Sequence, residues 1–271
     1  MPFETNDLQN AYLRYCEFKK NSSSSHERFI FPYLCGTYFT YRKIDVMRVV
    51  AIAKSISSHP KYLDVGCGYG DFLARIREFI PNATGIEKDA NIFYRFNKIK
   101  PDHINTVDIS WGKEKFDVVF VGWMDPGVDY RRYVANKTST IVTTLDEGIS
   151  LAAEYEDLGF HRVAWWRTPA WIDVNYEIMN KYYTKMTKDI YEQLHKLRGA
   201  HNLWYVYAKK EMVSIITNGF KSWIKNETKL LNDRFEFESV LDECGFSYNE
   251  EIPILRSKEK ALWKVIFDDE S

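Results

Sequence analysis

Short apolar runs alternate with segments of helical periodicity through much of the chain. Runs rich in branched and aromatic residues predict seven strands, over residues 61–65, 83–86, 103–107, 116–121, 140–144, 160–166 and 202–208. Apolar residues at helical spacing predict helices over 42–57, 71–80, 91–99, 130–135 and 148–158. Strands that alternate with helices are typical of an α/β fold, and we predict a doubly wound, mostly parallel, seven-stranded sheet.

Further segments surround this predicted sheet. A short helix is expected over 8–19, and a long inserted helix over 174–197, capped by Asp173 and ended by Gly199. A helix over 212–231 and a strand-like segment over 261–267 follow the last predicted strand. We therefore expect an N-terminal helical appendage and linker (1–41), a central domain (42–210) with a helical insertion (172–200), and a C-terminal α+β extension (211–271).

Composition and charge narrow the function classes. The 271 residues carry a formal net charge of -1, so no global basic field draws the protein onto nucleic acid. The four cysteines are widely spaced and form no metal-binding or redox motif, and no His, Glu and Asp set has metal-ligand spacing. This spacing predicts a protein without a metal. The charged first thirty residues and the lack of a long apolar run predict a cytoplasmic protein.

The segment 61–72 carries the most informative chemistry. A predicted strand ends at Asp64 and is followed by Gly66, Gly68 and Gly70 at alternate positions, and then by a helix. Alternating glycines let a backbone turn sharply and approach a ligand closely. The dinucleotide fingerprint G-x-G-x-x-G does not match, because the third glycine comes one residue early.

This loop and three later features resemble the class I, Rossmann-like methyltransferase family, which uses S-adenosylmethionine. The resemblance spans roughly residues 42–209 and implies a seven-stranded sheet whose last strand is antiparallel. The residues that it implies for cofactor binding are Asp64, Gly66, Gly68 and Gly70 for the methionine end, Glu87 for the ribose, Asp108 for the adenine, and Gly122 beneath the methionine part. Asp108 is explained equally well as a solvated turn residue.

The acceptor is less clearly encoded. Families that methylate amino groups of bases carry a Pro-Pro-aromatic motif after the fourth strand, whereas this chain has Asp125-Pro126-Gly127 at that place. We predict Asp125 as the catalytic residue, with a plain turn as the alternative. Tyr130 and two histidines, His161 and His195, are candidate bases in principle, although both histidines are better explained as structural or solvated residues.

The aromatic second half of the chain favours a small-molecule acceptor over RNA or protein. The lysines of the inserted helix, Lys181, Lys185 and Lys188, could meet phosphates, but a solvated helix face explains them better. Transfer of an aminopropyl or aminocarboxypropyl group from the same cofactor is a second hypothesis. A non-catalytic binding module is a third.

Overall fold

The computed structural model describes residues 43–95, 98–122, 124, 128–145, 154–167, 203–227 and 264–268, all within one compact unit. The helices predicted over 8–19 and 174–197 lie outside these residues, as does most of the segment predicted to be helical over 148–158. No helix in the part of the chain that the structure describes is long and apolar enough to cross a membrane.

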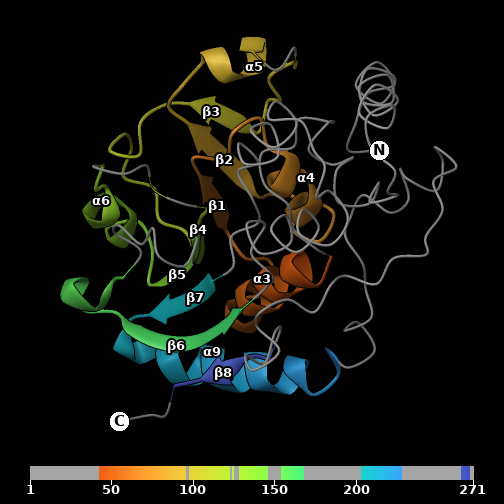
Figure 1. The fold of residues 1–271 in the computed structure, drawn as a ribbon, viewed down its shortest axis with the longest axis vertical. Coiled ribbons are helices and arrows are strands. Elements are labelled where there is room, and N and C mark those ends of the chain that lie inside the picture. Colours follow the sequence, from red (N-terminus) through yellow and green to blue (C-terminus); the bar gives the residue numbers. More distant parts are fainter. Residues whose placement is uncertain are drawn as a thin grey trace, which may run out of the picture. The chain divides into compact units, whose positions relative to one another are not determined.

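The sheet is doubly wound and mostly parallel, as predicted, and its first five strands all run parallel (Figure 1). Its strands are β1 (Tyr62–Val65), β2 (Thr84–Glu87), β3 (Ile104–Thr106), β4 (Val118–Val121), β5 (Thr140–Leu145), β6 (His161–Arg167), β7 (Leu203–Ala208) and β8 (Ile266–Phe267). The order is β3-β2-β1-β4-β5-β7-β6-β8, with β7 antiparallel to both β5 and β6. The antiparallel strand is confirmed, but the described sheet has eight strands rather than seven, because the short β8 pairs with β6.

The helices agree with the predictions in position and differ mainly in length. They are α3 (Lys43–Ile56), α4 (Asp71–Arg77), α5 (Asn91–Arg95), α6 (Arg131–Ala135), the 3-10 helix η1 (Glu156–Leu158) and α9 (Lys210–Ile224). The predicted helices over 71–80 and 91–99 end early: the chain turns after Arg77, and residues 98–99 are not helical. The described end of the segment predicted as a helix over 148–158 holds only η1.

A buried ion pair follows the end of α9, which lies at Ile224 and not at the predicted residue 231. Glu227 follows one turn after the helix, and its carboxylate accepts hydrogen bonds from Arg48 Nε (2.6 Å) and Nη2 (2.8 Å). Arg48 is fully buried on α3 and its guanidinium lies 5.0 Å from the centre of the Trp166 ring. This contact spans 179 positions in the chain, so local periodicity does not reveal it.

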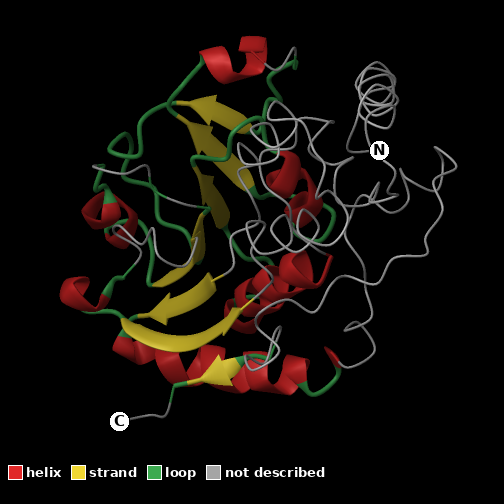
Figure 2. Cartoon of the chain, viewed as in Figure 1, coloured by secondary structure: helices red, strands yellow, loops and turns green. Residues whose placement is uncertain are grey.

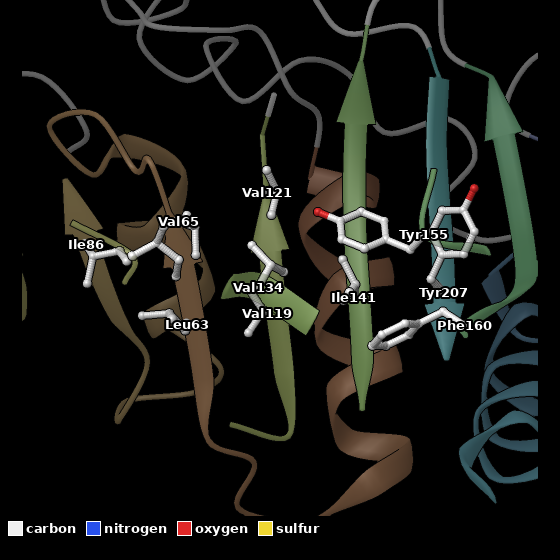
Figure 3. Packing of buried hydrophobic residues seen from close by; sticks show 11 residues of the cluster. Leu63, Val65, Ile86, Val119, Val121, Val134, Ile141, Tyr155, Phe160 and Tyr207 are labelled. Atoms are coloured by element: carbon white, nitrogen blue, oxygen red, sulfur yellow. The ribbon is translucent and has the colours of Figure 1, made fainter. Parts of the chain in front are cut away.

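Helices cover both faces of the sheet (Figure 2). On one face, α3, α4 and α9 pack over a row of aromatic rings. Each ring in the row contacts the next, in the order Phe72, Phe120, Trp204, Trp166 and Phe220. On the other face, Val134 of α6 and the rings of Tyr155 and Phe160 pack against the aliphatic residues of β1, β4 and β5 (Figure 3). Burial on both faces holds the parallel strands in register, which fixes the carboxyl ends from which the site is built.

Candidate functional site

The glycine loop connects the end of β1 to the start of α4. Gly66, Gly68 and Gly70 all have positive φ, at 67°, 59° and 88°. The N–H groups of Gly66 and Cys67 donate to the carbonyl of Ile86 at 2.9 and 3.2 Å, which ties the loop to β2. A Cβ on Gly70 would lie 2.5 Å from Ile104 Cδ1, so both backbone conformation and space favour glycine there.

Glu87 closes this loop from the end of β2. The N–H of Gly68 donates to Glu87 Oε2 at 3.0 Å, and the N–H of Asp89 donates to Oε1 at 2.9 Å. Each carboxylate oxygen accepts one of these bonds and has a further lone pair. The two residues that the resemblance assigns to the methionine and ribose ends are therefore in direct contact.

Asp64 gives the site a buried carboxyl group. It is 3% exposed, and its pKa is raised well above the usual value by burial first, and then by the negative charges of Asp71 and Glu87. A carboxylate under these conditions is stabilised by a cation placed beside it. The site therefore favours a positively charged ligand over a neutral or negative one.

Asp108 follows β3 and is engaged in its own turn. Its Oδ1 accepts the backbone N–H of Ser110 at 2.9 Å, and its Oδ2 lies 3.2 Å from Lys88 Nζ. The pKa of Asp108 is lowered to about 2, mainly by the hydrogen bonds from Ser110, with a smaller effect of Lys88. The side chain is 42% exposed, so this geometry is compatible with both a turn residue and a ligand contact.

Gly122 lies beside the glycine loop. Val65 pairs with Val121, so Gly66 and Gly122 leave neighbouring strands at the same level. His161 begins β6, whose amino end lies at the opposite edge of the sheet from the loop, so it does not meet these residues. The predicted catalytic residue Asp125 lies outside the described residues, as do His195, Lys181, Lys185 and Lys188.

Two residues near the loop gain importance from the structure. A Cβ on Gly85 would lie 2.7 Å from both Cys67 Sγ and Leu73 Cδ2, so this strand glycine lets β2 approach the loop and α4. A glycine inside a predicted strand is the signal that could have identified it. Tyr130, one of the candidate bases, has its hydroxyl 3.9 Å from the position that a Cβ would take on Gly66.

A cavity of about 320 Å³ lies elsewhere on the sheet. It is lined by Leu63, Thr84, Ile86, Trp111 and Lys137, among others, and by none of the predicted site residues. It extends towards the amino ends of β1 and β2. Ligands of doubly wound sheets bind outside the carboxyl ends, so we place the site at the glycine loop rather than in this cavity.

No protein-family model and no curated protein sequence matches the chain. Similar solved structures include a magnesium protoporphyrin IX methyltransferase from Synechocystis with bound cofactor, at 11% identity and a TM-score of 0.41 over 75% of this chain and 97% of that one. A methyltransferase from Archaeoglobus fulgidus dependent on S-adenosylmethionine has 18% identity and a TM-score of 0.38 over 62% and 95% of the two chains. A putative RNA methyltransferase from Pyrococcus horikoshii has 12% identity and a TM-score of 0.36 over 61% and 80%. This likeness concerns the fold alone; the parallel β1–β5 and the antiparallel β7 are what agree with the sheet expected from the sequence.

Proposed function

We propose that this chain is a methyltransferase that uses S-adenosylmethionine as its methyl donor. The observation that carries the proposal is the hydrogen bond between Gly68 and Glu87, because it joins a glycine loop of positive φ to a carboxylate at the neighbouring strand end. The buried Asp64 beside this loop supports a cationic ligand. An amino acid joined to a nucleoside through a sulfonium has both the charge and the hydroxyl groups that these residues suit.

The residues fit such a ligand. Asp64 and the glycine loop would hold the methionine end, with the ammonium near the buried carboxylate, and Gly122 would lie beneath it. Glu87 would accept the two ribose hydroxyls with the lone pairs left free by its backbone contacts. Asp108 would meet the adenine amino group. When bound, the sulfonium supplies a methyl group already activated for displacement, so the protein has mainly to align the acceptor.

For the acceptor we propose a small molecule with aromatic or apolar character. Asp125 would orient this acceptor or take its proton, because the loop after β4 opens at the carboxyl ends of the strands. Asp125→Asn keeps the shape and removes the charge, so turnover should fall about a hundredfold while cofactor affinity changes far less. A variant that turns over at the wild-type rate would reduce Asp125 to a turn residue.

The donor proposal is tested by titration calorimetry with S-adenosylmethionine, S-adenosylhomocysteine and NAD. We expect the first two to bind and NAD not to bind, because the loop lacks the dinucleotide spacing. If none binds, the fold serves as a non-catalytic module. Once an acceptor is found, S-adenosylhomocysteine as product indicates methyl transfer, whereas methylthioadenosine indicates aminopropyl or aminocarboxypropyl transfer.

The acceptor proposal has RNA or protein as the alternative. If Lys181, Lys185 and Lys188 bind RNA, affinity should fall as salt rises, and the triple alanine variant should have a shallower salt dependence. We expect the variant to keep its activity on the true acceptor. The segments 1–41, 172–200 and 211–271 are the additions to which we attribute acceptor recognition.

A further inference from the structure

The cavity of about 320 Å³ lies against one face of the sheet, apart from the glycine loop. Side chains of β1, β2 and β3 form its floor, where Leu63 is the register partner of Thr84 and Ile86 is that of Asn105. Leu63 and Ile86 lie on the face that carries the aliphatic cluster (Figure 3). The floor is therefore largely apolar and is held by the strands themselves.

The connection from β3 to β4 leaves room for this cavity. Residues 107–117 form turns and bends but no helix, so no helix of this connection covers the floor (Figure 2). Crossovers between parallel strands usually place a helix there. Trp111, Gly112 and Phe116 of the connection line the cavity instead. The volume that remains is in the range of small-molecule sites.

Trp111 presents an exposed indole ring at this cavity, since the residue is 69% exposed. The turn that carries it is fixed by three hydrogen bonds. The N–H of Trp111 donates to the carbonyl of Asp108 at 2.9 Å, and Lys137 Nζ donates to the carbonyls of Trp111 and Gly112 at 2.9 and 3.0 Å. A fixed and exposed ring beside a cavity offers a flat surface on which an aromatic ligand can stack.

Lys137 brings a buried positive charge to the same cavity. It is 7% exposed, and no carboxylate among the described residues forms an ion pair with its ammonium. The two turn carbonyls use two of its three N–H groups, so one N–H remains. The pKa of Lys137 is lowered mainly by burial, while Glu114 raises it and Lys115 lowers it by smaller amounts. An anion bound in the cavity would stabilise this charge.

The number of available donors favours a carboxylate over a phosphate. Lys61 at the rim lies 3.8 Å from Glu114, and both side chains are mostly exposed. The cavity therefore offers one buried cation with one remaining N–H. This matches a singly charged carboxylate, whereas a phosphate carries more charge and more acceptor oxygens. The apolar floor at Leu63 and Ile86 fits a ring better than a sugar.

We propose that this cavity is a second binding site, for a small aromatic carboxylate, in which Lys137 binds the carboxylate and Trp111 stacks on the ring. None of the residues assigned to the donor lines the cavity. The cavity extends towards the amino ends of β1 and β2, whereas the glycine loop lies at their carboxyl ends. The two sites are therefore separate, and a donor and an aromatic carboxylate can be bound at the same time.

Cinnamate is a suitable probe, and cinnamamide is its uncharged counterpart of nearly the same shape. Calorimetric titration into wild type should give a Kd of about 0.1–2 mM for cinnamate, the affinity expected for a ligand of this size. Cinnamamide should bind about tenfold more weakly, because it lacks the charge that pairs with the ammonium. Saturating S-adenosylmethionine should leave the affinity for cinnamate unchanged.

Variants assign the two contacts. Lys137→Met should reduce the preference for cinnamate over cinnamamide from about tenfold to about one, whereas Lys61→Met at the exposed rim should keep it. This ratio is measured on one preparation, so a loosened turn or an incompletely folded sample does not alter it. Trp111→Ala should weaken both ligands about three- to tenfold. Tyr94→Ala is the matched control, since Tyr94 is 89% exposed and does not line the cavity.

Four results would overturn the inference. The first is a wild-type protein that does not bind cinnamate at about 5 mM, well above the expected Kd. The second is equal affinity of wild type for cinnamate and cinnamamide, or a preference that survives in Lys137→Met. The third is wild-type affinity in Trp111→Ala. The fourth is displacement of cinnamate by S-adenosylmethionine, which would place the probe in the donor site.

Discussion

Removal of the Glu87 carboxylate tests the structural centre of the site. In Glu87→Ala, the N–H groups of Gly68 and Asp89 lose acceptors at 3.0 and 2.9 Å, and a bound ribose loses both of its hydrogen-bond partners. Hydrogen bonds to a charged group contribute about 1.5–3 kcal/mol when both partners are desolvated. Water can accept hydrogen bonds from the Gly68 and Asp89 N–H groups in the variant. We therefore assign this range to the total loss in the free energy of cofactor binding. The affinity for S-adenosylmethionine should thus fall about 10- to 150-fold.

The assay is calorimetric titration of S-adenosylmethionine, with urea unfolding to confirm that the variant is folded. Glu87→Gln keeps one acceptor oxygen but turns an amide N–H₂ towards a backbone donor, so its affinity should lie between those of wild type and Glu87→Ala. Glu114→Ala is the control, because Glu114 is 64% exposed and distant in sequence from the loop. Wild-type affinity in folded Glu87→Ala would refute the assignment of this carboxylate to the site.

Three further predictions follow from burial and backbone geometry. Asp64 has a pKa raised in the folded state, so its contribution to stability is full below the ordinary carboxyl pKa and is lost as pH rises through the raised value. Asp64→Asn should remove this loss, gaining stability over wild type at pH values above the ordinary carboxyl pKa in urea unfolding while weakening cofactor binding. Gly70→Ala should lose roughly 1–2 kcal/mol of unfolding free energy, because φ is 88° and the new Cβ would press on Ile104; an unchanged urea midpoint would argue against this conformation. Arg48→Met leaves Glu227 buried without its partner and should cost about 3–5 kcal/mol by the same measurement, whereas Lys54→Met on exposed α3 surface should cost far less.

The features that could be predicted from sequence are those whose cause is local. Alternating glycines after Asp64 predict a loop of positive φ, and the structure has it. The segment 116–121 is apolar throughout, and β4 within it is buried at every position. Trp166 and Trp204 are both buried in the core, which is the ordinary role of large aromatic side chains.

The features that escaped prediction depend on contacts between distant parts of the chain. The end of α9 is followed by the pairing of Glu227 with Arg48, which no periodicity encodes. The position of Tyr130 over Gly66 depends on how α6 packs against the sheet, so sequence placed it only among general candidates. The short β8 adds an eighth strand through two residue pairs with β6, too few to produce a recognisable pattern.

The pairing of β6 with β7 has a consequence for how such a protein could change its substrate during evolution. Arg167 and Leu203 are register partners, so the two described ends of the intervening chain lie side by side at one point of the sheet. That point lies at the carboxyl end of β6, the same edge of the sheet as the glycine loop. Two paired strand ends can equally be joined by a short turn, so the sheet does not depend on the length of what is inserted there. Under the proposed function, we expect that exchange of the chain between Arg167 and Leu203 changes acceptor recognition while the glycine loop is inherited unchanged.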